Sequence, residues 1–528
     1  MSSPASERYL IPCPGGRQVH LHKLGAGPVV VLLHESPRSS WALLPLAAKL
    51  AERFTVLALD TPGFGLSDPL AEPRPDMSHY ADGLAELFDA IGLERACLYG
   101  THTGACIAMA FAERYPQRTT LAVLDGYPVF TEAEQEEHLD AYLAPFRPDR
   151  MGTHVHWLWT RVRDQFSFFP WNRPGRAARL QRDPPPLAFM QGVVDDLLLA
   201  GDGYRVGYAA AFRYDGATPV ARATAKLAIT ARTDDLLHPH LDRLPPLPEG
   251  CEKRSLPADR EAWAVAIGDL MAPHAVDATL TLSIGGDRRW LLYLGDDMIT
   301  VRSFGPAHGK PLLVWHPLPG GGSQTWNLGR LLTGDRYVHV IDLPGCGGSS
   351  PAEASPDLLR ALVGAFDKPE LVACGLSGGF AASVADLTDR VTLVDPPLGA
   401  DLGPLPDLAP AWDGTHLTAT WWMLRDDLLF KPWHRRDHAH ARRVGLDIDV
   451  EGLHARFSET VRAGAAGMAT TRAAAAAWSP DLGYAADVVA MADDPDHEAV
   501  VAWAKSAARS VRSAGRDVRE IADAVIGD

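Results

Sequence analysis

The sequence has few cysteines, no excess of positive charge and no long hydrophobic run. Its six cysteines among 528 residues show neither CxxC pairs nor metal-ligand spacing. We therefore expect reduced thiols, no metal and no cofactor. The 50 Lys and Arg residues against 66 Asp and Glu residues give a net charge of −16, which argues against nucleic acid and anionic membranes as partners.

Targeting and nucleotide-binding signals are also missing. Residues 1–8 lack the basic start and apolar core of a signal peptide. No apolar run approaches the roughly 20 residues that span a bilayer. The glycines at 320–322 are not followed by a P-loop lysine. We expect a cytoplasmic protein that acts on a small-molecule substrate, without nucleic-acid or membrane partners.

What the sequence does contain is an internal repeat. A short apolar run ends in His34 in the first half and in His316 in the second, and each histidine precedes a D-x-P-G-x-G-like turn. The separation from His34 to Asp60 is the same as that from His316 to Asp342. Residues 152–173 align without a gap on 414–435, and the identical positions include Trp159, aligned with Trp421, and Trp171, aligned with Trp433. This pattern indicates a tandem duplication.

Each half alternates apolar strands with helices, which predicts a mostly parallel sheet covered on both faces. A largely helical insertion follows in each half and is expected to form a cap over the strand ends. We predict a first domain at 1–272 with its cap near 135–220, and a second at 273–528 with its cap near 405–478. The second is expected to begin with a hairpin strand at 279–283. Fused copies often keep an ancestral dimer interface, so we expect an internal pseudo-dimer, while higher oligomers stay open.

Two short glycine motifs point to the site. Gly100-Thr101-His102-Thr103-Gly104 and Gly375-Leu376-Ser377-Gly378-Gly379 each follow an apolar run and precede small residues. This is the strand–turn–helix context of the nucleophile elbow, so the chain resembles the α/β-hydrolase superfamily twice over. The first half also resembles a bacterial subgroup with a G-x-H-T-G-A elbow. The resemblance implies that His102 and Ser377 occupy equivalent positions below their caps.

The resemblance also implies a catalytic acid and a histidine, and here the sequence departs from it. The segments before the last helix of each half, 255–260 and 513–517, contain no histidine. His102 is therefore the sharpest candidate, as a base, an acid or a nucleophile. Ser377 is a weak nucleophile unless His416 or His497 supplies a base. The acid candidates after the late strands are Asp234, Asp235 and Asp494, with Asp125 and Asp395 one strand earlier as alternatives.

Further candidates come from the loops and the cap. The resemblance assigns oxyanion contacts to the backbone at Glu35, Ser36 and Thr103 in the first half, and at Leu318 and Gly378 in the second. The repeated cap motif adds residues that either pack or line the pocket: His154, Trp159, Arg163, Trp171 and His416.

These residues support an enzyme that hydrolyses an ester or C–C bond in a small apolar or aromatic carbonyl compound, with an incomplete triad. A non-hydrolytic acid–base reaction, such as that of a lyase or decarboxylase, fits the same residues. A non-catalytic binding or scaffold protein with degenerate sites is the third interpretation. We expect the first half to carry the chemistry because its elbow presents a titratable imidazole.

Overall fold

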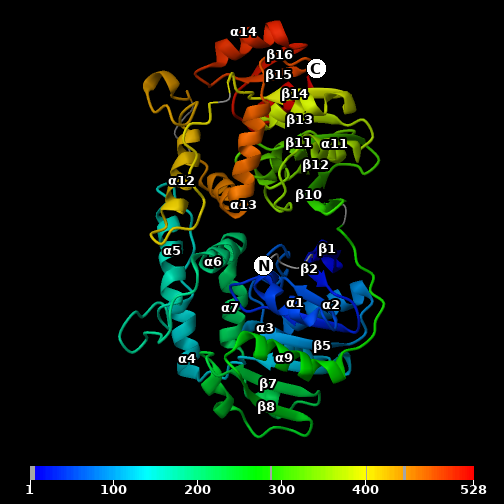
Figure 1. Ribbon diagram of the computed structural model, residues 1–528, viewed down its shortest axis with the longest axis vertical. Coiled ribbons are helices and arrows are strands. Elements are labelled where there is room, and N and C mark those ends of the chain that lie inside the picture. Colours follow the sequence, from blue (N-terminus) through cyan, green and yellow to red (C-terminus); the bar gives the residue numbers. More distant parts are fainter. Residues whose placement is uncertain (1–5, 286–287, 400, 444–447, 528) are drawn as a thin grey trace. The chain divides into compact units, whose positions relative to one another are not determined.

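The computed structural model describes residues 6–285, 288–399, 401–443 and 448–527. The chain divides into two compact units, whose elements are labelled in Figure 1. The first comprises Met1–Arg147 and Arg161–Gly286, and the second comprises Pro148–Thr160 and Asp287–Asp528. Within the described ranges, no helix has the length and apolar character needed to cross a bilayer.

An eight-stranded sheet forms the centre of the first unit. Its strand order is β1 (Glu7–Pro12), β2 (Gln18–Leu24), β4 (Thr55–Leu59), β3 (Val29–Leu33), β5 (Ala96–Thr101), β6 (Thr119–Asp125), β7 (Leu227–Arg232), β8 (Cys251–Leu256). β1 and β2 pair antiparallel, and the strands from β4 to β8 are parallel. All five residues of β3 are apolar and buried, as expected for a parallel strand covered on both faces.

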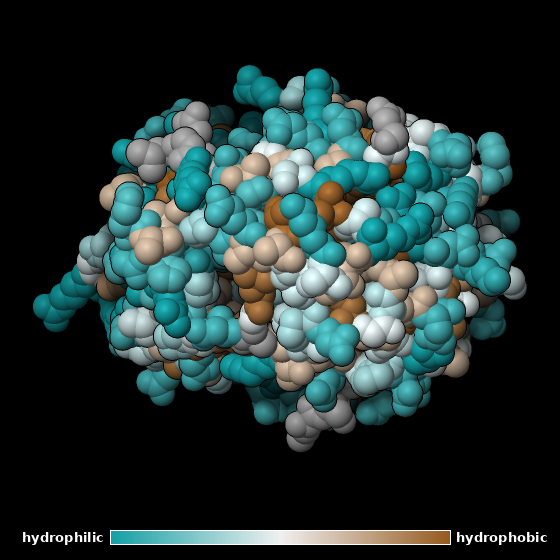
Figure 2. All heavy atoms as spheres, turned by 90° about the horizontal axis from the view of Figure 1, so that it is seen from above, coloured by the Kyte–Doolittle hydropathy of each residue, from teal (hydrophilic) through white to brown (hydrophobic). Residues whose placement is uncertain are grey.

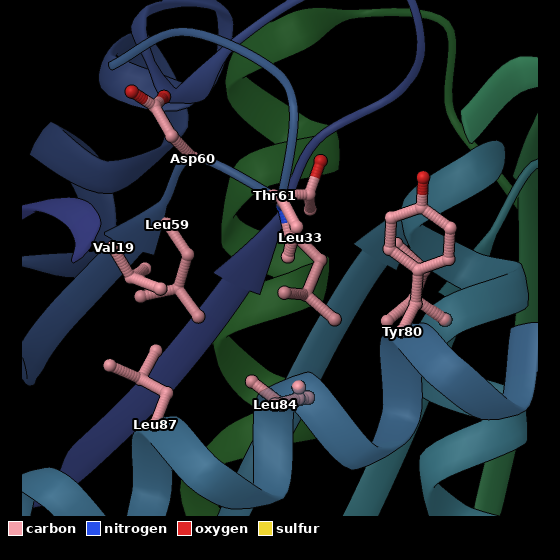
Figure 3. Close-up of a pocket in the computed structure, with 11 residues that line it drawn as sticks. Val19, Leu33, Leu59, Asp60, Thr61, Tyr80, Leu84 and Leu87 are labelled. Atoms are coloured by element: carbon pink, nitrogen blue, oxygen red, sulfur yellow. The ribbon is translucent and has the colours of Figure 1, made fainter. Parts of the chain in front are cut away.

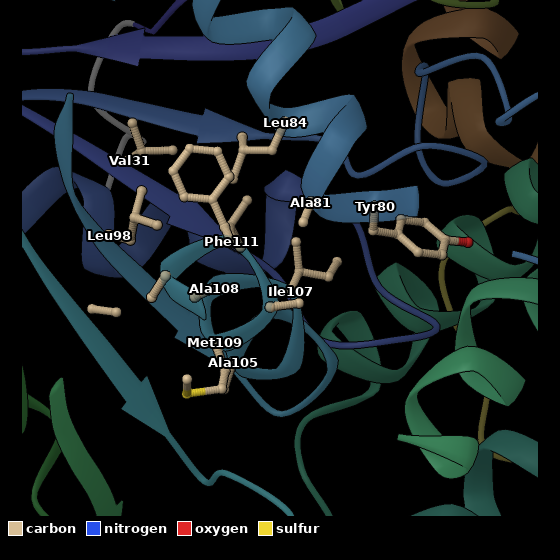
Figure 4. Packing of buried hydrophobic residues seen from close by; sticks show 14 of the residues in the cluster. Val31, Tyr80, Ala81, Leu84, Leu98, Ala105, Ile107, Ala108, Met109 and Phe111 are labelled. Carbon is tan, nitrogen blue, oxygen red and sulfur yellow. The ribbon is translucent and has the colours of Figure 1, made fainter. Parts of the chain in front are cut away.

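Helices cover both faces of this sheet. On one face lie α2 (Met77–Ile91) and α3 (Thr103–Arg114), and on the other lie α1 (Leu44–Leu50) and α9 (Arg260–Met271). Figure 4 shows Phe111 and Ile107 of α3 gathered with Leu84 of α2 and Val31 of the sheet. The apolar side chains packed between the sheet and its helices hold these layers together. Hydrophilic residues cover most of the molecular face drawn in Figure 2.

The second unit repeats this arrangement. Its eight strands lie in the order β9 (Arg289–Leu294), β10 (Asp297–Phe304), β12 (Arg336–Ile341), β11 (Lys310–Trp315), β13 (Glu370–Cys374), β14 (Arg390–Val394), β15 (Asp487–Met491), β16 (Ser510–Ala514). The helices outside its insertion are α10 (Trp326–Leu331), α11 (Pro356–Gly364), α14 (His497–Ala507) and α15 (Val518–Ile526). The matching strand order confirms the predicted pair of tandem α/β domains.

Both sheets carry a helical insertion between corresponding strands. Between β6 and β7 lie α4 (Glu132–Glu137), α5 (Thr153–Gln165), α6 (Leu187–Ala200), α7 (Tyr204–Arg213) and α8 (Thr218–Ala221). Between β14 and β15 lie α12 (Thr415–Asp427) and α13 (Val450–Ala477), the latter interrupted at Gly464. Each insertion follows the carboxyl end of a strand, where open α/β sheets place their sites.

One local expectation is wrong. Residues 279–283 do not start the second hairpin, which is formed by β9 and β10. Instead, the Thr281 amide donates to Ile91 O at 2.9 Å, and Leu280 and Leu282 pack on the core of the first unit. The second glycine motif opens a 3₁₀ helix, η9 (Gly375–Ser383). The internal pseudo-dimer and the predicted domain limits stay predictions.

The repeated cap motif forms a reciprocal contact within the second unit, which includes Pro148–Thr160. A Cβ on Gly152 would lie 2.5 Å from Trp421, and one on Gly414 would lie 2.7 Å from Trp159. Both glycines have a φ of +76°. The Trp159 indole Nε1 donates to Trp412 O at 2.9 Å. This pairing explains why the two copies share these glycines and tryptophans.

We expect Trp159→Phe to lower the free energy of unfolding locally by about 1–2 kcal/mol, because it removes a buried hydrogen bond and part of a packed ring. Trp159 is 2% exposed. Hydrogen exchange of the α12 amides measures the change. Trp422→Phe is the control, since Trp422 is 41% exposed and should change stability by less than about 0.5 kcal/mol. Equal exchange in both variants would contradict the packing role.

Candidate active site

A strained turn presents His102 between β5 and α3. β5 ends at Thr101 and α3 begins at Thr103, and His102 has φ 49° and ψ −109°. A Cβ on Gly100 would lie 2.2 Å from Gly104 O, and a Cβ on Gly104 would lie 2.2 Å from Leu33 O. Only glycine fits at either position. A non-glycine residue held at positive φ is often part of a functional site, so the turn itself marks His102.

Asp235 follows β7 and reaches the His102 ring. Nε2 of His102 lies 3.2 Å and 3.1 Å from the two carboxylate oxygens of Asp235. The Leu237 amide donates to Asp235 Oδ1 at 2.8 Å and fixes the carboxylate. Since Nε2 carries the proton that Asp235 accepts, Nδ1 is left without a hydrogen-bond partner among the described residues. It is the nitrogen available for chemistry.

Gly126 completes this pair, and sequence reasoning missed it. A Cβ on Gly126 would lie 2.4 Å from His102 Cδ2 and 3.4 Å from Asp235 Oδ2. Any side chain here would displace the imidazole. The sequence did offer a signal, because this glycine directly follows Asp125, the aspartate that ends β6.

The charge on His102 is set by its neighbours. Loss of hydration lowers the pKa of the ring, but the charge and hydrogen bond of Asp235, with smaller contributions from Glu35 and Asp125, raise this pKa to about 9. The side chain still keeps 36% of its surface exposed. The resting residue at neutral pH is therefore an imidazolium. This pair stabilises the fold fully between about pH 3.8 and pH 6.5, the ordinary pKa values of its two groups. The contribution is lost as pH rises through about 9 and also in acid, where Asp235 becomes protonated.

The other aspartates of the first half have different partners. Asp234 is paired with Arg232, whose Nε lies 2.9 Å from Oδ1. The Asp125 carboxylate accepts hydrogen bonds from Tyr99, Thr230 and Trp263 at 2.9, 2.9 and 3.0 Å. Among the candidate acids of this half, the structure brings Asp235 alone to hydrogen-bond distance of His102.

The loop after β3 is held rigidly beside the elbow. His34 Nδ1 donates to Glu35 O at 2.9 Å, and its Nε2 accepts from the Thr61 amide at 3.0 Å. Arg38 and Ser39 bind Asp196 of α6, which attaches the loop to the insertion. Ser36 is 5% exposed, and its Oγ has no hydrogen-bond partner among the described residues. A buried hydroxyl without a hydrogen-bond partner is uncommon in folded proteins.

Thr103 is buried at the first position of α3, so its amide has no acceptor within the helix. The oxyanion roles of the Glu35, Ser36 and Thr103 amides stay predictions.

The second unit does not repeat this elbow where the sequence places it. Leu33, which precedes His34, pairs with Gly100, whereas Trp315, which precedes His316, pairs with Ala373. Counting from these pairs, the residue that corresponds to His102 is Gly375, with a φ of 58°. The expected equivalence of His102 and Ser377 is therefore wrong.

The next strand agrees with this register. Gly100 pairs with Leu124, and Ala373 pairs with Leu393, so Asp395 corresponds to Gly126. Asp395 and Gly126 have φ values of 53° and 62°. An aspartate thus stands in the second unit where the first leaves room for an imidazole.

Ser377 is fully buried within η9, and its Oγ donates to Cys374 O at 2.8 Å. Gly378 lies beside it against Leu393, and Leu318 is buried in the loop after β11. None of these contacts supplies a base to Ser377.

A buried charge cluster occupies the corresponding region of the second unit. Asp494, which matches Asp235, accepts from Lys431 at 3.0 Å, from Arg516 at 2.8 Å and from Arg442. Lys431 also lies 2.5 Å from Asp395. Burial and the charge of Asp395 raise the pKa of Asp494, against the lowering effect of Arg442 and Lys431. Asp494 is committed to cations rather than to a histidine.

The cap candidates are placed mainly by packing. The His154 ring meets Trp421 with centroids 4.6 Å apart, and the His416 ring meets Trp159 at 5.0 Å, both within the second unit. Trp171 belongs to the first unit, where its Nε1 donates to Tyr142 O at 3.2 Å. Arg163 is half-buried on α5. Of the two roles considered for the cap motif, packing and pocket lining, these contacts favour packing for the His154–Trp159 segment.

One small cavity lies in the core of the first unit rather than at His102. Its volume is about 20 Å³, enough for roughly one water molecule. Figure 3 shows it between Leu33 and Leu59 of the sheet and Leu84 and Tyr80 of α2. This volume is too small for a substrate, and neither His102 nor Asp235 is among the lining residues. Across the described ranges, no three His, Cys, Asp or Glu side chains gather as metal ligands.

Residues 28–243 match the alpha/beta hydrolase fold family. This match and the strand order show an α/β-hydrolase fold in the first unit, and the second unit repeats the same strand order. An uncharacterized protein of Mycobacterium tuberculosis is 38% identical over 102 residues, which are 19% of this chain and 29% of that protein.

The 2-hydroxy-6-oxo-2,4-heptadienoate hydrolase of Pseudomonas putida is 36% identical over 135 residues, 24% of this chain and 47% of the relative. The chain thus spans less than half the length of these relatives. Among solved structures, an esterase from Exiguobacterium antarcticum is 18% identical, with a TM-score of 0.41, over 50% of this chain and 99% of the esterase.

Proposed function

We propose that the first unit hydrolyses an ester, or a C–C bond beside a carbonyl, in a small apolar or aromatic compound. The observation that carries this proposal is the His102–Asp235 contact at an intact elbow turn, where Nδ1 of the imidazole has no hydrogen-bond partner among the described residues. A histidine oriented by a carboxylate is the usual means by which enzymes move protons near neutral pH.

In this proposal water replaces the missing serine as the nucleophile. Neutral His102 takes a proton from water through Nδ1 while the water oxygen attacks the carbonyl carbon. Asp235 stabilises the resulting imidazolium. His102 then returns the proton to the leaving alkoxide or carbon as the tetrahedral intermediate collapses, which gives an acid and an alcohol, or an acid and a protonated carbon. The amides at Glu35, Ser36 and Thr103 are the proposed donors to the oxyanion.

The name of the Pseudomonas putida relative supports a small carbonyl substrate, since it describes hydrolysis of an oxo-dienoate. A lyase or decarboxylase would use the same base without adding water. Incorporation of ¹⁸O from labelled water into the acid product distinguishes hydrolysis from both.

We propose a non-catalytic role for the second unit. Its elbow position is Gly375, and its late aspartate, Asp494, is paired with three cations. These observations support the degenerate-site interpretation for this half alone.

The pH dependence of hydrolysis tests the pair. Since the pKa of His102 is about 9, we expect kcat/KM to rise about tenfold per pH unit from pH 7 until it levels near pH 9. Asp235→Asn removes the charge that raises this pKa, so the limb should move to lower pH by about 2 units, with a lower plateau. Asp234→Asn is the matched control and should leave the limb in place. An unmoved limb in the Asp235 variant would refute the assigned base.

A further inference from the structure

Arg161 is a buried cation that forms no ion pair with the residues that the structure describes. It lies on α5 and is 1% exposed. Its Nη1 donates to Gln165 Oε1 at 2.9 Å. Its Nε and Nη2 are inaccessible to solvent and have no hydrogen-bond partner among the described residues. Because a guanidinium stays charged even when buried, these two donors are costly to leave unmet.

Aromatic rings surround this guanidinium. Its Cζ lies 5.1 Å from the centroid of Trp171 and 5.3 Å from that of Tyr204. The ring faces attract the cation but offer no in-plane acceptor. The Tyr204 hydroxyl donates its proton to Ala144 O at 2.6 Å, and no acceptor among the described residues is in hydrogen-bond geometry with Nε or Nη2 of Arg161. The surroundings therefore favour a cation while leaving its hydrogen bonds open.

The two open donors have a specific geometry. Nε and Nη2 form one edge of the planar guanidinium, and two parallel N–H groups on an edge match the two oxygens of a carboxylate. A single water oxygen can accept from both donors, but it brings no negative charge to the buried guanidinium.

The second unit shows that the cap helix does not need an arginine here. The aligned residue is Met423, which is 3% exposed on α12. Methionine therefore satisfies packing at this position. Arginine occurs in the copy that has the elbow histidine, and methionine occurs in the copy whose site is filled by ion pairs.

A series of ring contacts runs from His240 to the ring that covers Arg161. The loop in which Gly126 lies against His102 continues to Val129, whose amide donates to His240 Nδ1 at 3.0 Å, and the His240 ring contacts Phe130 at 5.3 Å. Phe130 contacts His138 at 5.2 Å, and His138 contacts Tyr142 at 5.5 Å. Trp171, which covers Arg161, contacts Tyr142 at 6.1 Å. His138 Nδ1 is also buried without a partner among the described residues.

We propose that Arg161 binds a carboxylate of the substrate through Nε and Nη2, with the apolar body of the substrate along this aromatic wall. This inference rests on the proposed function only for the reaction, which takes place at the other end of the substrate. The binding of the carboxylate to Arg161 does not depend on it. Trp171 lies in the segment between α5 and α6, where the backbone forms a single β-bridge, from Phe168 to Arg179. In this proposal the anion reaches Arg161 by displacing the Trp171 ring.

Calorimetric titration of the full chain with benzoate, phenylacetate and 4-phenylbutyrate, each paired with its uncharged amide, tests the proposal. We expect at least one acid to bind at least tenfold more tightly than its amide. Arg161→Met should remove this preference without lowering the Tm of the unliganded protein, because it relieves an unpaired buried charge. Arg161→Lys keeps the charge but loses the edge and should also lose the preference.

Arg179→Met is the matched control, since Arg179 is an exposed cap arginine that also lies over a ring, that of Phe168. Its titration should match wild type. Equal affinity for acids and amides, no binding of any acid at 20 mM, or unchanged preference in both Arg161 variants would overturn the proposal. His102→Ala should bind the acids normally, so a failure of the proposed reaction is separable from a failure of the anion site.

Discussion

His102→Ala is expected to lower kcat/KM for ester hydrolysis by about 10²–10⁴-fold, the usual contribution of a positioned acid–base residue. The imidazole is the titratable group that the strained turn presents, and Asp235 is 3.1 Å from it. Without the ring, the Asp235 carboxylate is left alone, and a lone carboxylate is too weak a base to replace the imidazole. We expect the remaining activity to lose its rise toward pH 9.

Ser377→Ala is the control for this experiment, and it should keep kcat/KM within about twofold. Its hydroxyl is buried and bonded to Cys374 O, and the register places it two residues beyond the elbow position. The p-nitrophenyl esters of acetate, butyrate and benzoate serve as substrates for both variants. Activity that survives the His102 change and disappears with the Ser377 change would reverse the assignment and make the second unit the working site.

Much of the fold could be predicted because it depends on local patterns. Buried parallel strands are continuous apolar runs, and the glycines of the elbow are required by contacts of 2.2 Å. The repeat of 152–173 in 414–435 marked both copies. Asp235 could be placed near His102 because the carboxyl ends of parallel strands share one edge of the sheet.

The rest depends on register and burial, which the motif does not encode. Ser377 matches G-x-S-x-G in letters, but β13 ends one residue before Gly375, so the turn falls earlier than the motif suggests. Arg161 was passed over because the two copies differ there. Identity between copies identified the residues that pack, such as Trp159, whereas a functional residue is expected to differ once one copy has lost its chemistry.

We expect Arg442→Met to destabilise the second unit by about 3–5 kcal/mol, the usual effect of breaking a buried ion pair from one side. Arg442 and Asp494 are 6% and 1% exposed at their side chains. Asp494 would keep Lys431 and Arg516, but these cations are shared with Asp395. The cluster would then contain less positive charge than its carboxylates need in a region with little water. Hydrogen exchange at the amides of β15 measures the loss.

The matched control is Lys310→Met, which breaks a surface ion pair of the same unit. Lys310 is 47% exposed and bridges Glu370 and Asp389, so its loss should cost about 1 kcal/mol or less. Hydrolysis by the first unit, assayed at a temperature where both variants are folded, should equal wild type, because the cluster is assigned to stability alone. A folded Arg442 variant without activity would place these ion pairs in the chemistry, and unchanged exchange at β15 would show that they do not hold the second unit together.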